Sequence, residues 1–135
     1  DRLIISAPFL QLGAGISGGV LNAALKAALH RGVSVELVTT GQSLSGLDVA
    51  SFRRAAKGRL RVSCPTTNVL DPRLLGSHAK FCVADGEAAY IGSANLTGPG
   101  LAGHLELGVL VHGHLAKQVE EFWALCHQLG LFVEA

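Results

Sequence analysis

The stretch from His78 to Asn95, HAKFCVADGEAAYIGSAN, constrains this chain more than any other part of its sequence. Two apolar runs, 81–84 and 88–91, flank an Asp-Gly pair, and this pattern predicts two strands joined by a tight turn. Such a hairpin returns the chain to the side on which it began. His78 and Lys80 lie two positions apart, so on a strand both would point to one face.

The predicted hairpin brings several polar side chains to one place, namely those of His78, Lys80, Ser93 and Asn95. An ammonium, a hydroxyl and a carboxamide can hold the oxygens of a phosphate group as charge builds on them. Imidazole can act as nucleophile or as acid, because its unperturbed pKa of about 6.5 lets both protonation states exist near neutrality. The cluster therefore predicts a site that handles a phosphate group.

The spacing His-x-Lys-x4-Asp-x6-Gly-Ser-x-Asn, with Leu-Thr-Gly and Leu-Glu-Leu-Gly after it, resembles the phospholipase D superfamily and its HKD motif. Within the superfamily, the chain is similar to bacterial phospholipase D-like nucleases and to the phospholipase D-like protein of phage-defence islands. The resemblance implies a metal-independent phosphodiesterase that needs no cofactor. In the mechanism it implies, His78 attacks phosphorus and forms a phosphohistidine. A second histidine protonates the leaving group and then activates water.

The resemblance also gives roles to the other catalytic candidates. Lys80 and Asn95 would hold the non-bridging phosphoryl oxygens, and Ser93 would add a hydroxyl donor. Glu106 would bond the other ring nitrogen of His78 and so fix its tautomer.

Two further motif residues are expected to be structural. Asp85 would hold the amides of its own turn, and Gly92 would let the backbone approach closely. The catalytic candidates also have an ordinary reading, since a His beside a Lys is commonly a surface residue and Ser or Asn often follows Gly in turns. The joint match of all motif positions favours the catalytic interpretation. His104 stands where relatives often carry an amide, which leaves the hydrogen bonding near Glu106 open.

Hydrophobic periodicity predicts an α/β fold over residues 1–135, and the order of its elements resembles a single phospholipase D-like half-domain. We expect a mixed, mostly parallel sheet with helices on both faces, because strands and helices alternate in the first half of the chain. The expected strands are 3–9, 33–38, 59–64, 81–84, 88–91 and 105–111, and the expected helices are 20–29, 47–57 and 114–129. Residues 66–76 are expected to form an irregular loop.

The implied chemistry needs two imidazoles, but only His78 has a lysine two residues further on. A homodimer with His78 beside its symmetry mate would supply the second ring and would bury apolar surface of a chain that is 49% hydrophobic. The alternative is a second half-domain upstream. Because the sequence starts at Asp1 within a strand-like run, we expect it to be a fragment that lacks upstream sequence.

The substrate expected first is nucleic acid. Of the 11 basic residues, several concentrate between positions 53 and 61 as a candidate rim for its backbone, namely Arg53, Arg54, Lys57, Arg59 and Arg61. A solvated helix face is the alternative reading. Aromatic residues make up 5% of the chain and do not indicate a base-stacking platform. The alternative functions are a lipid-directed phospholipase or phosphatidyltransferase, and a weakly active nucleic-acid-binding module of a defence or repair complex.

The glycine run Gly13-x-Gly15-x-x-Gly18 resembles a dinucleotide-binding fingerprint only loosely, because three residues separate it from the preceding strand. A flexible connection is the better interpretation. The sequence shows no signal peptide and no apolar run of about 20 residues, so we expect a cytoplasmic protein without a membrane segment. Its three cysteines, which show no paired spacing, are expected to be buried free thiols.

Overall fold

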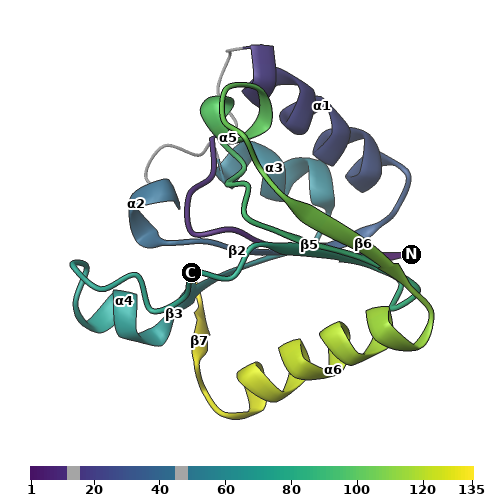
Figure 1. The fold of residues 1–135 in the computed structure, drawn as a ribbon. Coiled ribbons are helices and arrows are strands. Elements are labelled where there is room, and N and C mark those ends of the chain that lie inside the picture. Colours follow the sequence, from purple (N-terminus) through teal and green to yellow (C-terminus); the bar gives the residue numbers. More distant parts are fainter. Residues whose placement is uncertain (12–15, 45–48) are drawn as a thin grey trace.

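A computed structural model of the chain describes residues 1–11, 16–44 and 49–135. These residues form a seven-stranded sheet with helices on both faces (Figure 1), as the sequence predicts. The strands are β1 (Arg2–Ser6), β2 (Ser34–Val38), β3 (Leu60–Pro65), β4 (Phe81–Ala84), β5 (Ala88–Gly92), β6 (Gly108–His112) and β7 (Phe132–Glu134). The helices are α1 (Ile16–His30), α2 (Gly41–Leu44), α3 (Val49–Ala56), α4 (Thr66–Leu70), α5 (Gly98–Ala102) and α6 (His114–Gln128). Gly13 and Gly15 of the glycine run lie outside the described residues.

The strand order in the sheet is β6-β5-β4-β1-β2-β3-β7. Among the strands that the structure describes, only β1, β2 and β3 pair in parallel, since helices on one face connect them as crossovers. The other pairs, β1–β4, β4–β5, β5–β6 and β3–β7, are antiparallel. The expectation of a mostly parallel sheet is therefore wrong. The crossover pattern of the first half of the chain does not continue beyond β3.

Several element boundaries also differ from those that the sequence predicts. Helix α1 begins at Ile16, whereas its expected start is position 20. Strand β6 begins at Gly108, whereas its expected start is position 105. Residues 66–70 of the expected loop form α4. The sequence analysis missed α5 and β7, which are shorter than the window in which periodicity can be read.

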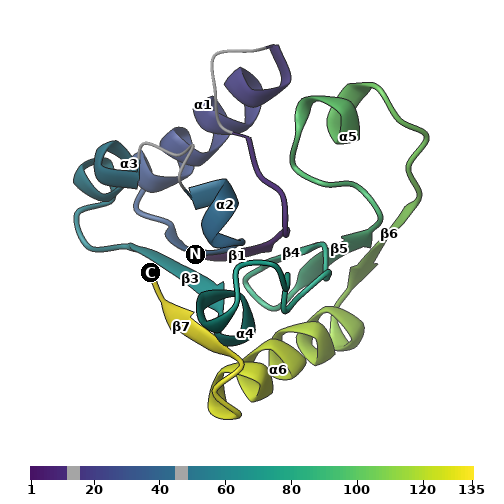
Figure 2. The same cartoon turned by 90° about the vertical axis from the view of Figure 1, so that its left-hand side faces the viewer.

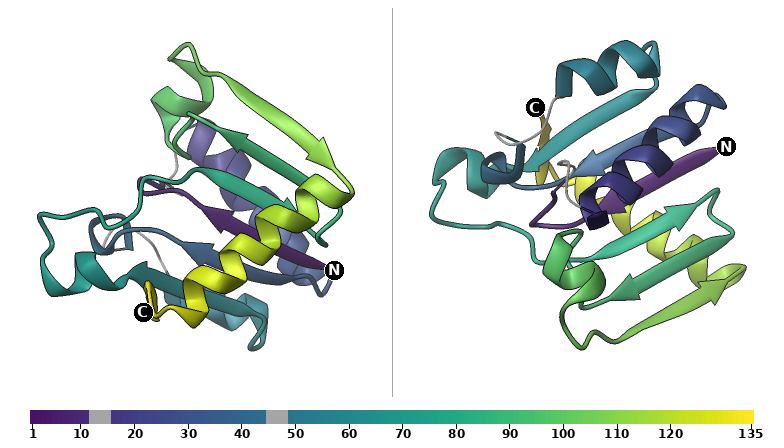
Figure 3. Two further views of the ribbon diagram at one scale, coloured as in Figure 1. Left: turned by 60° about the horizontal axis from the view of Figure 1, so that its bottom comes forward. Right: turned by 90° about the horizontal axis from the view of Figure 1, so that it is seen from above.

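The hydrophobic residues form two cores, one on each face of the sheet. Ile5 packs in the core beneath α1 and α3, whereas its neighbour Ile4 packs in the core beneath α6. Successive strand residues point to opposite faces, so one apolar strand serves both layers. Figure 3 shows the two layers, with α6 crossing one face and α1 and α3 covering part of the other.

A buried carboxylate helps to fix α6 on the sheet. Glu36 of β2 is 6% exposed and faces α6, where its Oε1 lies 2.7 Å from Nε2 of His127. Arg2 pairs with Glu36 at 3.1 Å and with Glu120 of α6 at 2.9 Å. Since a buried charge is costly unless it is paired, these contacts favour one placement of the helix.

The segments that carry the motif residues meet at one end of the sheet (Figure 2). Ser6, the last residue of β1, pairs with Val38 at the end of β2 and with Phe81 at the start of β4. Gly92 at the end of β5 pairs with Gly108 at the start of β6. The motif segments 78–80, 93–95 and 106–107 therefore lie at the carboxyl end of the parallel strands, where α/β sheets commonly bind ligands.

The packing of α6 makes a prediction about stability. Trp123 is 1% exposed and its ring lies 5.4 Å from that of Phe81 and 4.6 Å from that of Phe132. Trp123→Ala should lower the free energy of unfolding by about 3–5 kcal/mol, because it leaves a cavity between helix and sheet. Denaturant unfolding of this variant is compared with Glu121→Ala, an exposed position on the same helix that should change little. Equal effects of the two substitutions would contradict this packing.

Candidate active site

The predicted hairpin is present and its register is continuous. Phe81 pairs with Ile91 and Ala84 pairs with Ala88, and the Gly92 amide donates to the Lys80 carbonyl at 3.1 Å. This last bond extends the pairing by one position beyond β4. It places Lys80 directly opposite Gly92, the residue before Ser93.

His78 and Lys80 contact each other at this end of the hairpin. Lys80 Nζ lies 3.2 Å from Nδ1 and 3.3 Å from Nε2 of His78, and it donates to the His78 carbonyl at 3.1 Å. The His78 residue is exposed, whereas Lys80 is 8% exposed. The imidazole is therefore open to a ligand, and a sheltered cation stands beside it.

Burial lowers the pKa of Lys80 below its ordinary value of 10.5, and the negative charge of Glu106 partly opposes this effect. At alkaline pH, Lys80 is therefore protonated to a smaller extent than a surface lysine. The effect of Glu106 also means that its carboxylate lies within electrostatic reach of the ammonium.

Ser93 and Glu106 form a second contact in the site. The Ser93 hydroxyl donates to Oε2 of Glu106 and accepts from the Leu107 amide at 3.0 Å. A backbone bond of 3.0 Å from the Ser93 amide to the Leu107 carbonyl holds the two segments together. Glu106 also lies 3.9 Å from the ring of His104, a wide separation for an ion pair. In this structure Glu106 accepts a hydrogen bond from the Ser93 hydroxyl, whereas the family resemblance implies a bond from Glu106 to the His78 ring.

Asn95 has a fixed backbone and a side-chain oxygen without a partner. Its Oδ1 is buried and has no hydrogen-bond partner among the described residues. Thr97 caps α5 by accepting from the Gly100 amide at 3.3 Å, and a Cβ on Gly100 would collide with the Asn95 backbone. The Thr-Gly-Pro-Gly run, with a cap residue followed by proline, was the available sequence signal for this short helix.

The two structural motif residues have other partners than expected. Asp85 lies at the hairpin turn with φ of 56° and accepts from the Arg2 amide at 2.5 Å. It therefore ties the turn to the start of β1 instead of holding its own amides. Gly92 makes room for the ring of Tyr90, since a Cβ there would lie 2.7 Å from the ring's Cζ atom.

Cys82 lies in the same hairpin but is unsuited to act as a nucleophile. Burial raises the pKa of its thiol to about 11, so the reactive thiolate is scarce at neutral pH.

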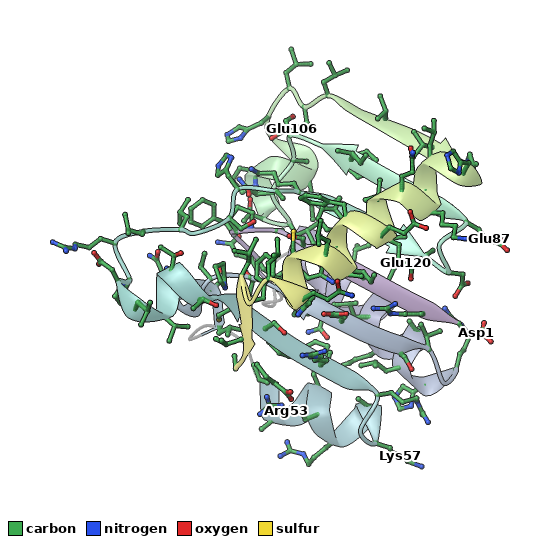
Figure 4. All side chains as sticks on the ribbon, turned by 90° about the horizontal axis from the view of Figure 1, so that it is seen from below. Asp1, Arg53, Lys57, Glu87, Glu106 and Glu120 are labelled. Carbon is green, nitrogen blue, oxygen red and sulfur yellow. The ribbon has the colours of Figure 1, made fainter. Side chains whose placement is uncertain are left out.

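The candidate basic rim does not border this cluster. Figure 4 shows Arg53 and Lys57 at the opposite side of the molecule from Glu106. Strands β4, β1 and β2 separate β5 from β3, and neighbouring strands are about 4.8 Å apart, so roughly 19 Å lie between β5 and β3. Arg61 lies on β3 itself, and Arg59 donates to the Leu29 carbonyl at 3.4 Å. The candidate rim therefore lies away from the His78 cluster, and a role in holding a nucleic-acid backbone stays a prediction for Arg53, Arg54, Lys57, Arg59 and Arg61.

An open groove of about 580 Å³ leads from His78 and Lys80 along α6. Its remaining walls are mostly apolar and include Ile91, Val111, Leu115, Val119 and Phe122. Within the described part of the chain, no group of three or more His, Cys, Asp or Glu residues is arranged to hold a metal ion.

The chain matches the family model described as cardiolipin synthase, PLD-like domain, over residues 2–126. It therefore belongs to the phospholipase D-like family. The human 5'-3' exonuclease PLD4 is 30% identical over 118 residues, which are 80% of this chain and 22% of that protein. The chain thus spans about a fifth of the length of this relative.

Three solved structures share the fold. Nuc of Salmonella typhimurium, a phospholipase D family member, matches with a TM-score of 0.68 and 18% identity over 99% of this chain and 81% of its own. NucT from Helicobacter pylori matches with a TM-score of 0.69 and 12% identity over 99% of this chain and 82% of its own. Phosphatidylserine synthase of Haemophilus influenzae matches with a TM-score of 0.68 and 16% identity over all of this chain and 34% of its own.

The buried position of Lys80 predicts how activity depends on pH. Because its pKa is lowered from 10.5, the ammonium is lost as the pH rises through the lowered value, and kcat/KM should fall there. In Lys80→Arg the cation persists, since a guanidinium stays charged, so any remaining activity should decline only at higher pH. Profiles of kcat/KM against pH for both proteins check this. An identical alkaline decline in the two would show that another group titrates.

Proposed function

We propose that the chain carries the active site of a metal-independent phosphodiesterase whose substrate is nucleic acid. The observation that carries the proposal is the contact between the exposed His78 imidazole and the sheltered Lys80 ammonium at 3.2 Å. A nucleophile and a cation at this separation can engage one phosphate group together.

The proposed reaction has two steps. In the first, a ring nitrogen of His78 forms a bond to phosphorus, the bond from phosphorus to the leaving oxygen breaks, and a second imidazole gives that oxygen a proton. In the second step, water attacks the phosphorus of the phosphohistidine, and the second imidazole takes a proton from this water. The nitrogen–phosphorus bond then breaks, which releases the phosphate product and restores His78.

The remaining residues act on charge and position in this proposal. Lys80 and Asn95 hold the non-bridging oxygens, Asn95 through its amide nitrogen, which is the donor of its carboxamide. Ser93 holds the Glu106 carboxylate, whose negative charge acts on Lys80. Glu106 would take up a bond to the His78 ring once the ring carries positive charge, which Ser93 can permit by rotating its hydroxyl.

The second imidazole has to come from outside this cluster. A homodimer with His78 near its symmetry mate, or a second half-domain, would supply it. The exposed position of His78 and the apolar groove beside it support such a partner, because both would be covered by a neighbouring domain of the same fold.

Nucleic acid is favoured by the relatives. The human protein is an exonuclease by name and supports this substrate with 30% identity.

A cytoplasmic localisation and a role in phage defence stay predictions. None of the helices that the structure describes is long and apolar enough to cross a membrane.

A lipid-directed phosphatidyltransferase is the second candidate. The apolar walls of the groove next to His78 could accept acyl chains, and the matching family description names cardiolipin synthase. A weakly active nucleic-acid-binding module is the third candidate, in which the fold is kept and turnover is slow.

These candidates differ in a cleavage assay with EDTA present. The protein should cleave single- or double-stranded DNA in the chelator, and His78→Ala should lose at least about a thousandfold of the rate. His112→Ala is a matched control, since His112 is exposed on β6 and pairs with Ala88 at the far end of the sheet from His78. Its activity should be unchanged.

A strict need for a divalent metal would contradict the covalent histidine mechanism. Release of headgroups from vesicles of phosphatidylglycerol without cleavage of DNA would establish the lipid alternative. Saturable binding of DNA with no turnover in any condition would establish the binding module.

A further inference from the structure

The single tyrosine of the chain, Tyr90, lies on β5 within the motif hairpin. Its neighbour Ala89 packs in the core beneath α6, so Tyr90 points to the other face of the sheet. There the residue is 37% exposed, and its register partner Leu110 is 63% exposed. This part of the sheet face is therefore open to solvent.

Two glycines that face each other form a floor beneath the ring. Gly92 of β5 pairs with Gly108 of β6, and the ring of Tyr90 occupies the space where both side chains would stand. A Cβ on Gly92 would lie 2.7 Å from the Cζ atom, and a Cβ on Gly108 would lie 2.5 Å from the Cε2 atom. The ring consequently lies across the two strands, with its outer face directed away from the sheet.

The ring also points toward the catalytic end of the hairpin. It extends from position 90 to the level of Gly92, which is hydrogen-bonded to Lys80 and precedes Ser93. The phenol oxygen therefore lies at the level of Gly92, one residue before Ser93, which bonds Glu106. Because Lys80 pairs with Gly92, its side chain leaves the hairpin on the face that carries the Tyr90 ring.

We propose that the ring of Tyr90 is the stacking surface for a nucleobase next to the scissile phosphate. This inference rests on the proposed function, because it requires nucleic acid as the substrate. An aromatic ring that lies flat on a sheet and is supported from beneath presents its outer face to unpaired bases. A ring that merely filled the core would be covered. The low aromatic content did not indicate such a platform, but one well-placed ring is sufficient for one base.

The test compares a short oligothymidylate with an oligomer of the same length built from abasic tetrahydrofuran units. Tyr90→Leu should raise KM for the thymidine substrate about tenfold with little change in kcat, in line with the loss of one stacked base. It should leave KM for the abasic substrate unchanged. Tyr90→Phe keeps the ring and should behave like the wild type, which excludes a general effect on folding.

A second measurement does not depend on turnover. A 5-iodouracil oligonucleotide irradiated with His78→Asn protein should cross-link to the peptide that contains Tyr90. Equal cleavage of both oligomers by the wild type and Tyr90→Leu would contradict the stacking role of Tyr90, and so would a cross-link at another peptide. The cleavage itself would still support the proposed phosphodiesterase activity. If nothing is cleaved but the cross-link forms at Tyr90, the platform stands and the proposed activity is wrong.

Discussion

The register of the β4–β5 hairpin determines where every polar group of the candidate site lies. The pairing of Phe81 with Ile91 continues as the bond from the Gly92 amide to the Lys80 carbonyl, so the beginning and the end of the motif meet. A slip of one residue would turn Lys80 to the face opposite that of Gly92, so the beginning and the end of the motif would no longer meet on one face. The Asp-Gly turn, whose two residues both have positive φ, fixes this register locally.

The candidate site combines an exposed imidazole with charged groups that are largely covered. His78 is exposed, while Lys80 is largely buried and Glu106, at 22% side-chain exposure, is held by Ser93. Desolvation strengthens the interaction of these groups with a bound phosphate, because water no longer screens them. The opening at His78 is where a second imidazole from a like domain would enter in the proposed mechanism.

The sequence was sufficient for features that depend on local pattern. The two apolar runs and the Asp-Gly pair predicted the hairpin, and its length predicted that the His78/Lys80 end and the Ser93/Asn95 end lie side by side. It did not reveal long-range arrangement. The basic residues near Arg53 are grouped in sequence, but β3 lies four strands from β5. The bond between Ser93 and Glu106 and the glycine floor of Tyr90 depend on how β5 and β6 pair, which periodicity does not encode.

Covalent attachment of phosphorus to His78 is the most direct measure of the proposed chemistry. The protein is mixed with a DNA substrate radiolabelled at the scissile phosphorus, denatured in alkali during turnover, and digested into peptides. We expect the label on the peptide that contains His78, bound to a ring nitrogen and lost in acid, as phosphohistidine is. Label on a different residue, or rapid turnover without any covalent label, would contradict the mechanism.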